Sequence, residues 1–258
     1  MINLLVCGAA GKMGRAIVSI AKEDRDIKIS GTLEYEGSKA IGTGDPVISS
    51  INNLKEVLRD TDAVIDFTNP ESTLKNLETA SNQKVPMVIG TTGFSVQQKD
   101  KITQISKVIP VVFSPNMSVG VNVLFKLVEE AAKKMPDYDI EIVEFHHNKK
   151  KDAPSGTAAK LAEIAASSVG RNINDVAVYG RHCVESARKK EEIGVLSVRA
   201  GDIVGDHTVY FVGQGERIEL THRASSRDTF AAGAVKAAKW VVGKEPGLYD
   251  MSDVLSLK

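Results

Sequence analysis

The chain has 258 residues, of which 42% are hydrophobic and 26% are charged, and its 33 basic and 33 acidic residues give a formal net charge of zero. This balance predicts a globular protein of one or two domains without bulk attraction for polyanions or lipid headgroups, which argues against nucleic-acid binding. Two cysteines cannot form a disulfide framework, no apolar run has the length of a membrane span, and no leader precedes the first strand-like segment. We therefore expect a cytoplasmic protein that binds neither nucleic acid nor membrane.

Short β-branched segments alternate with helical segments over the first half of the chain. Strands are predicted at 2–6, 27–33, 63–67, 85–89 and 111–113, and helices from about 13, at 71–81 and at 95–105. This alternation is typical of an α/β, Rossmann-like parallel sheet covered by helices on both faces.

The pattern changes after Asn116. A helix is predicted at 119–134, a strand at 138–144, a polar loop at 146–155 and a helix at 157–168, followed by strands at 195–199, 207–212 and 216–221. Successive strands without intervening helices indicate a second, α+β domain with a mixed or antiparallel sheet. An alanine-rich helix at 230–242 could return to the first domain. We therefore expect one domain from residues 1–117 and 228–258 and another from residues 118–227.

The first predicted strand continues directly into a glycine-rich turn, Gly8-Ala9-Ala10-Gly11-Lys12-Met13-Gly14, and then into a helix. Glycines allow a tight turn close to a pyrophosphate, and the amides at a helix N-terminus stabilise its charge. Alone, this pattern could also be a simple strand-to-helix turn. Glu34 favours the dinucleotide interpretation, because such folds place an acid at the end of the second strand against the ribose hydroxyls.

Two later strand ends should lie along the same edge of the parallel sheet, Gly90-Thr91-Thr92 and Ser114-Pro115-Asn116-Met117. Open α/β sheets bind ligands at the carboxyl ends of their strands, so both segments are candidates for cofactor contacts. Each could equally be an ordinary turn.

The segment from Glu144 to Thr157 combines two adjacent histidines, three lysines and a Ser-Gly-Thr helix start. Adjacent histidines that leave a strand point to opposite sides, so at most one of them faces a given reacting atom. The hydroxyls and N–H groups of the helix start suit a carboxylate. We interpret the segment as an anion-binding acid/base site rather than a solvated loop. No metal site is expected, because the histidines lack a supporting carboxylate or cysteine cluster at ligand spacing.

This loop resembles the signature of the dihydrodipicolinate reductases, in which a His-His pair leads through a lysine to Asp-Ala-Pro-Ser-Gly-Thr. The glycine turn running into Arg15, the stretch 198–207 and the stretch 216–227 are similar to the same family, so the likeness covers essentially the whole chain. It implies reduction by NADH or NADPH of a cyclic imine dicarboxylate, 4-hydroxy-tetrahydrodipicolinate, with loss of water, in lysine and diaminopimelate biosynthesis. It also implies a homotetramer built through the second domain, which would bind the substrate.

The resemblance further implies roles for individual residues. His146 would be the acid/base residue, and Lys150 a proton donor that also contacts a substrate carboxylate. His147 would be a substrate ligand, and Gly156 and Thr157 would hold the second carboxylate. The cofactor would contact the glycine turn and three strand ends: Gly8, Ala9, Ala10, Gly11, Lys12, Met13, Glu34, Gly90, Thr91, Thr92, Ser114, Pro115, Asn116 and Met117.

Two alternatives remain open from the sequence. One is another small amino-acid dehydrogenase with the same two-domain plan, against which the histidine loop argues. The other is a non-catalytic dinucleotide sensor, against which the intact acid/base candidates His146 and Lys150 argue.

Cofactor choice is a separate expectation. Several relatives carry a basic residue after the ribose-binding acid, whereas this chain has Tyr35, which cannot neutralise a 2′-phosphate. We therefore expect both cofactors to be accepted, with NADH used at least as well as NADPH.

Overall fold

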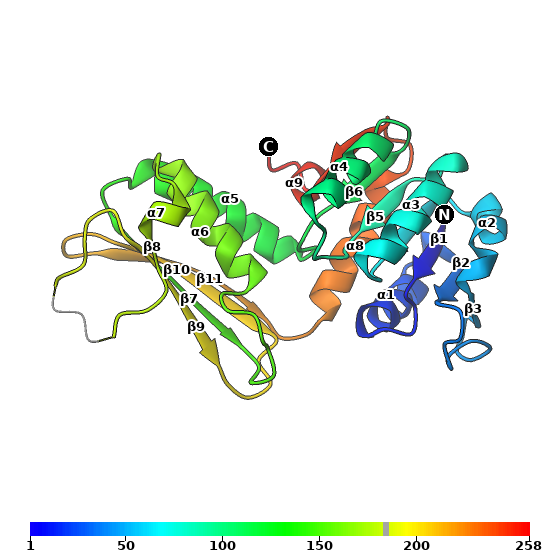
Figure 1. Ribbon diagram of the computed structural model, residues 1–258, viewed down its shortest axis with the longest axis horizontal. Coiled ribbons are helices and arrows are strands. Elements are labelled where there is room, and N and C mark those ends of the chain that lie inside the picture. The colour runs from blue at the N-terminus through cyan, green and yellow to red at the C-terminus, as the bar shows by residue number, and fades with distance from the viewer. Residues whose placement is uncertain (183–185) are drawn as a thin grey trace. The chain divides into compact units, whose positions relative to one another are not determined.

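The computed structural model describes residues 1–182 and 186–258, which divide into two compact units. Unit 1 contains Met1–Val119 and Arg227–Lys258, and unit 2 contains Gly120–Ser226. Each unit has its own sheet, against which its helices pack (Figure 1). Cys183 lies outside the described residues. Cys7 is fully buried, and burial raises the pKa of its thiol well above the usual value, so this thiol is unreactive.

Unit 1 is built on a seven-stranded parallel sheet in the order β12-β6-β5-β4-β1-β2-β3. Its strands are β1 (Ile2–Cys7), β2 (Ile27–Glu34), β3 (Ile48–Ser50), β4 (Ala63–Asp66), β5 (Met87–Ile89), β6 (Pro110–Phe113) and β12 (Gly247–Tyr249). Its helices are α1 (Lys12–Glu23), α2 (Leu54–Val57), α3 (Pro70–Asn82), α4 (Val96–Ile105), α8 (Asp228–Val241) and α9 (Met251–Val254), with 3-10 turns at Ile51–Asn53 and Leu58–Asp60.

The strands in the middle of this sheet, β1, β4 and β5, are apolar except at Asn3 and Asp66, because helices cover both of its faces. Along β1, Leu4 and Val6 pack into one core with α1 and α8, whereas Leu5 and Cys7 pack into a second core with α2, α3 and α4. Helix α8 comes from the C-terminal part of the chain and supplies four buried alanines to the first core, Ala231, Ala234, Ala237 and Ala238.

Unit 2 contains a five-stranded mixed sheet in the order β11-β10-β7-β9-β8. Its strands are β7 (Asp139–His146), β8 (Ala177–Val178), β9 (Ile193–Arg199), β10 (Gly205–Val212) and β11 (Arg217–Ala224), and its helices are α5 (Val119–Lys134), α6 (Gly156–Ser168) and α7 (Ile173–Val176). Strand β7 is parallel to β9 and antiparallel to β10. The alternate residues Ile140 and Ile142 of β7 face a core that α5 and α6 complete.

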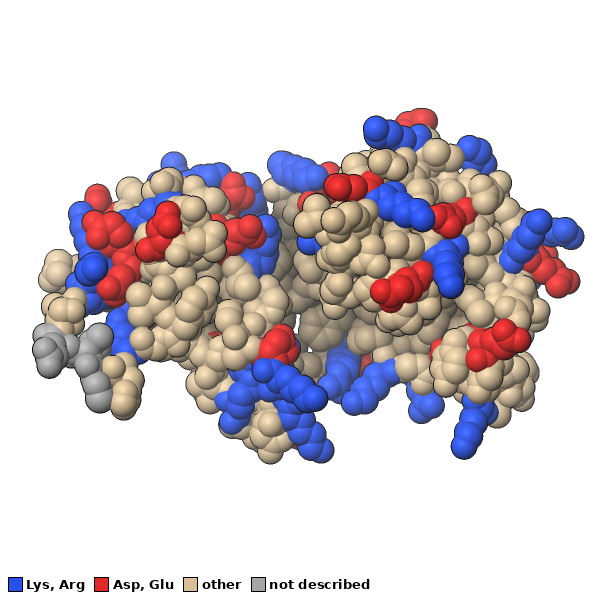
Figure 2. Space-filling model, viewed as in Figure 1, with Lys and Arg blue, Asp and Glu red and all other residues tan. Residues whose placement is uncertain are grey.

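The predicted fold class is confirmed, and the long elements lie close to their predicted positions. The short elements β3, β8, β12, α2, α7 and α9 were not predicted. Strand β7 extends to His146, so this histidine ends a strand instead of opening the loop. No helix within residues 1–182 and 186–258 is both long and apolar enough to cross a membrane. Figure 2 shows basic and acidic side chains interspersed on the visible face of both units.

Candidate functional site

The glycine turn of unit 1 has the close backbone packing that a dinucleotide site needs. Gly8 has a φ of +79°, and a Cβ there would lie 2.9 Å from the carbonyl oxygen of Phe67. A Cβ on Gly14 would lie 2.1 Å from the carbonyl oxygen of Gly8, so only glycine lets α1 pack directly beneath the turn. Gly11 caps α1 without a side chain, which leaves the first amides of this helix available to an anion.

Glu34 ends β2 beside this turn, as predicted. Its Oε2 accepts a hydrogen bond from the backbone N–H of Ala10 at 3.0 Å, and its Oε1 accepts one from that of Tyr35 at 3.1 Å. The carboxylate therefore occupies an amide of the glycine turn that the sequence had suggested for a cofactor contact.

Most of the remaining cofactor candidates line two hollows in unit 1 that share Phe67 and Thr68. The larger, of about 530 Å³, is lined by Lys12, Met13, Gly90, Thr91, Thr92, Pro115, Asn116 and Met117, together with Phe230. The smaller, of about 280 Å³, is lined by Gly8, Glu34 and Tyr35, together with Ile51, Asn69, Ser72 and Asn76. The structure thus gathers three predicted strand ends at one edge of the sheet. Ser114 is buried beside them, and its hydroxyl donates to the carbonyl of Asn116 at 2.9 Å.

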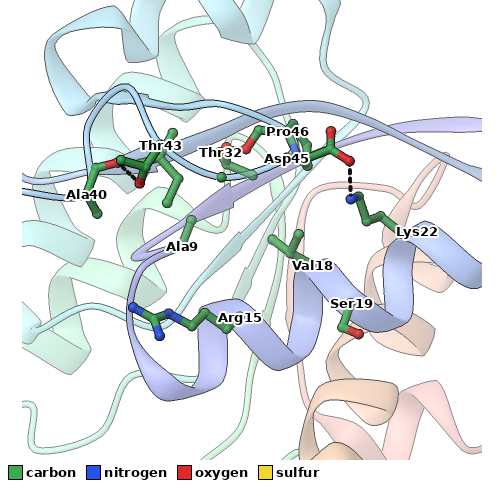
Figure 3. Close-up of a pocket in the computed structure, with 12 residues that line it drawn as sticks. Ala9, Arg15, Val18, Ser19, Lys22, Thr32, Ala40, Thr43, Asp45 and Pro46 are labelled. Atoms are coloured by element: carbon green, nitrogen blue, oxygen red, sulfur yellow. Dashed lines mark hydrogen bonds and ion pairs between the residues drawn. The ribbon is translucent and has the colours of Figure 1, made fainter.

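A third hollow, of about 390 Å³, lies between α1 and the segment 40–48 (Figure 3). An ion pair of 2.7 Å between Lys22 and Asp45 lies at one end, and the side chain of Arg15 projects from the first turn of α1. Ala9 is the only predicted cofactor residue that lines it. Lys12 and Arg15, which are close in sequence, therefore line different hollows.

The end of β4 contributes residues that sequence reasoning missed. The fully buried carboxylate of Asp66 accepts hydrogen bonds from the N–H of Thr68 at 3.0 Å, from the hydroxyl of Thr73 at 2.8 Å and from the amide of Asn76 at 2.8 Å. Thr91 donates to the same carboxylate at 3.3 Å, which ties the turn after β4 to the turn after β5. The signal was present, because β4 ends at the same sheet edge as the strands that were chosen.

In unit 2, the site is organised around Glu144, two residues before His146 on β7. Glu144 is fully buried, and its two oxygens accept from Nη2 and Nη1 of Arg199 at 2.8 and 2.9 Å and from the N–H of Ser155 at 3.1 Å. Nδ1 of His146 is also hydrogen-bonded to it. Burial alone would raise the pKa of Glu144, but these hydrogen bonds outweigh burial and lower its pKa to about 2. Glu144 is therefore an anion at neutral pH.

His146 is itself buried and faces a second histidine. Burial lowers its pKa, Glu144 raises it, and the charges of Lys150 and Arg199 lower it further, so the imidazole is largely neutral at pH 7. The ring of His207, at the start of β10, lies 5.2 Å from that of His146 in an edge-to-face arrangement. Burial, and then repulsion by His146, lowers the pKa of His207 to about 3.

The loop after β7 is anchored at several points. The N–H of Asn148 donates to the carbonyl of Gly201, and Lys150 Nζ lies 2.9 Å from Oδ2 of Asp152. Nδ1 of His147 is buried and, within the described part of the chain, has no hydrogen-bond partner.

The helix start at the end of this loop is partly used within the protein. The Ser155 hydroxyl accepts from the N–H of Ala158 at 3.2 Å, which caps α6, and is hydrogen-bonded to Nε2 of His207 at 3.1 Å. Its own N–H is taken by Glu144, so Ser155 is not free to bind a carboxylate. Gly156 is exposed, and a Cβ there would meet nothing within 4 Å.

The structure corrects one premise of the sequence analysis. A carboxylate does support the histidines, because ligand atoms of Glu144, His146 and His207 all lie within 4.8 Å of one another. Arg199, however, contacts both oxygens of Glu144, and its guanidinium would repel a metal ion. We interpret the group as a hydrogen-bonded network, and the expectation that no metal binds stays a prediction.

Comparisons with known proteins cover both units. Residues 2–117 match the family described as dihydrodipicolinate reductase, N-terminus, and residues 120–255 match its C-terminus. The chain is 52% identical to a 4-hydroxy-tetrahydrodipicolinate reductase of Syntrophotalea carbinolica and 50% identical to one of Geobacter sulfurreducens, over 100% of each chain. A dipicolinate-bound dihydrodipicolinate reductase from Paenisporosarcina sp. TG-14 superimposes with a TM-score of 0.79 at 25% identity, over 97% of each chain.

A probable dehydrogenase from Thermotoga maritima shares the fold alone, with a TM-score of 0.67 and 13% identity over 99% of this chain and 93% of that one. The matches to both family halves and to full-length relatives lead to the same assignment. The chain belongs to the dihydrodipicolinate reductase family of oxidoreductases.

Proposed function

We propose that the chain reduces 4-hydroxy-tetrahydrodipicolinate to tetrahydrodipicolinate, with loss of water, at the expense of NADH or NADPH in lysine and diaminopimelate biosynthesis. The observation that carries the proposal is the pairing of a glycine-turn dinucleotide site in unit 1 with a buried His146 and a neighbouring Lys150 in unit 2. The dinucleotide site and the two residues of unit 2 belong to a chain that is 50 to 52% identical to two of the reductases along its whole length.

The residues of unit 1 fit a nicotinamide dinucleotide. The hollow beside Thr91 and Asn116 would hold the nicotinamide half, and the hollow beside Glu34 and Tyr35 the adenosine half, with the first amides of α1 between them. When bound, the reduced nicotinamide supplies the hydride.

The residues of unit 2 supply charge and a proton. The ammonium group of Lys150 would donate a proton and contact one substrate carboxylate. The N-terminus of α6 at Gly156 and Thr157 would hold the second carboxylate. His147 would add a further contact to the substrate. His146, held neutral by burial, would exchange a proton through Nε2, since Nδ1 faces Glu144.

A coupled assay tests this function. Product generated by dihydrodipicolinate synthase is supplied with either cofactor, and nicotinamide absorbance is followed; we expect its absorbance to fall with the purified chain present. Turnover of homoserine or aspartate instead would favour a different dehydrogenase, and cofactor binding without turnover of any substrate would favour a sensor.

Cofactor preference belongs to the same proposal. We infer that NADH is used at least as well as NADPH, because Tyr35 is 65% exposed and cannot neutralise a 2′-phosphate, and Glu34 repels one. Among the described residues, no lysine or arginine lines the hollow of Glu34 and Tyr35, and Lys12 and Arg15 of α1 line two other hollows.

We also infer a cytoplasmic homotetramer that assembles through the sheet of unit 2. Helices α5 and α6 pack on one face of this sheet. The other face carries partly exposed apolar side chains from β7 and β9, namely Val143, Phe145, Leu196 and Val198. An apolar sheet face of this kind favours burial against another copy. Light scattering of the wild type should give the mass of a tetramer, and Phe145→Glu should lower that mass. A monomeric wild type, or an unchanged mass for Phe145→Glu, would contradict this assembly route.

A further inference from the structure

The buried pair of Glu144 and Arg199 contacts the segment 146–155, which runs from the end of β7 to the N-cap of α6, at its beginning, middle and end. Glu144 is hydrogen-bonded to His146 at the beginning and to the N–H of Ser155 at the end. Nη2 of Arg199 donates to the carbonyl of Asp152 at 2.6 Å. Glu144 is fully buried, and the side chain of Arg199 is 19% exposed. One ion pair therefore fixes both ends of the segment that carries the proposed proton donors.

The same pair determines which nitrogen of His146 carries a proton. An anionic carboxylate beside Nδ1 accepts the N–H there, so in the neutral ring Nε2 keeps its lone pair. Nε2 faces Gly205, the first residue of β10, where a Cβ would lie only 2.9 Å away. Glycine at this position leaves the space in front of Nε2 open.

Stability alone does not explain such a pair. Replacing a buried ion pair by apolar side chains of similar volume is often neutral or stabilising, so a buried ion pair is weak evidence of a contribution to stability. The contacts of this one are directed at the acid/base histidine and at the loop that contains Lys150.

We propose that Glu144 and Arg199 are positioning residues of the reductase. They orient His146 with Nε2 toward the substrate and hold the segment 146–155 in its working conformation, while Gly205 keeps the approach to Nε2 open. This inference rests on the proposed function, because it assigns to His146 the proton exchange described above.

The charged groups that face His146 make the proposal testable by pH. These are Glu144 on the same strand, Arg199 on β9, His207 on β10 and Lys150 on the loop. Glu144 raises the pKa of His146, and Arg199 lowers it. Glu144→Gln should therefore shift the His146 limb of the kcat/KM profile to lower pH, and Arg199→Gln should shift it to higher pH.

Glu141 offers a matched control on the same strand. Its carboxylate is also paired with arginines, at 2.9 and 3.0 Å from Arg181 and 3.0 Å from Arg188, but it lies on the opposite face of the sheet and does not contact the loop. Glu141→Gln removes a paired carboxylate from β7 without touching His146. We expect it to leave kcat and the pH profile unchanged.

The experiment measures kcat, the KM for substrate, the KM for cofactor and the pH profile of kcat/KM for the whole chain. The protonation of the imidazole nitrogens is followed by ¹⁵N NMR, and His146→Gln identifies the signals of His146. We expect Glu144→Gln to lower kcat by about 100-fold, to leave the cofactor KM within about twofold, and to lose the Nδ1–H preference of His146. Gly205→Ala, which removes no charge, should lower kcat by at least about tenfold through crowding at Nε2.

Three outcomes would overturn the inference. The first is a wild-type kcat in folded Glu144→Gln. The second is an equal loss of kcat in Glu144→Gln and Glu141→Gln, with the pH profiles of both unshifted. The third is a wild-type kcat in Gly205→Ala. If Glu144→Gln does not fold, the Arg199→Gln pH shift and the Gly205→Ala kcat decide instead. An inactive wild type would refute the proposed function itself, and the ¹⁵N spectra would still show separately whether Glu144 sets the Nδ1–H state of His146.

Discussion

Acidification tests the charge on Glu144, because this carboxylate is fully buried and its pKa is lowered to about 2. A folded-state pKa below the unfolded value means that the unfolded chain binds the proton more readily. The stabilisation is therefore fully present above pH 4.5, the ordinary glutamate value, and is lost as the pH falls toward about 2. At about 1.4 kcal/mol per pH unit, the difference between 4.5 and about 2 corresponds to about 3 kcal/mol.

Glu144→Gln should accordingly lower the free energy of unfolding by about 3 kcal/mol at neutral pH, with its deficit relative to wild type shrinking below pH 4.5. The two proteins converge because protonated Glu144 leaves Arg199 without an anion, just as glutamine does. Titrating groups that do not interact with Glu144 are common to both proteins and cancel in the difference, whereas His146, whose pKa Glu144 raises, contributes to it.

Urea unfolding at pH values from about 7 to about 3 measures this difference. Far-UV circular dichroism follows both units, whereas the single tryptophan, Trp240, lies in α8 and reports on unit 1. The deficit should therefore appear in the dichroism transition of unit 2. A deficit of the same size at both pH extremes would refute the reasoning, because the cost would then not arise from the charge.

Three further predictions concern the site. Lys150→Ala and His146→Gln should lower turnover by roughly two to four orders of magnitude while cofactor affinity stays nearly unchanged, and His147→Gln should act mainly on the substrate KM. Steady-state kinetics measure both effects. Wild-type turnover for Lys150→Ala would contradict its role, and so would a loss of turnover in His147→Gln together with a change of KM alone in His146→Gln. Tyr35→Arg should shift the ratio of specificity constants toward NADPH by about 1 to 2 kcal/mol, and a wild type that already favours NADPH by more than about tenfold would exclude the cofactor proposal. Burial lowers the pKa of His207 to about 3, so between pH 6.5 and about 3 the unfolded chain takes up this proton and the folded chain does not. The free energy of unfolding should therefore fall as the pH falls through this range, and His207→Gln should flatten its pH dependence. An unchanged slope in the variant would show that His207 is not buried in its neutral form.

The sequence was sufficient for the long elements, because they carry strong periodicity over many residues. The helix predicted at 119–134 coincides with α5. Strands β3 and β12 have only three residues each, too few for a pattern, and they exist because β2 and β6 present an open sheet edge to them.

The candidate site divides in the same way. The glycine turn and Glu34 are close in sequence and were predictable from spacing. The contact of Glu144 with Arg199 spans 55 residues and depends on the parallel register of β7 and β9, which pairs Glu144 with Ser197 and His146 with Arg199. His207 reaches Ser155 only because β10 pairs with β7. No local pattern encodes such register.

The return of α8 and β12 to unit 1 bears on how the chain folds during translation. Unit 2 is a single continuous segment, whereas unit 1 needs residues 227–258 to cover the core that contains Leu4, Val6 and Ile17. The ribosome therefore releases a complete unit 2 while unit 1 still exposes an apolar face. Nascent chains that stop before Asp228 should hold a protease-resistant unit 2 beside an N-terminal segment that needs chaperone protection until the last helices emerge.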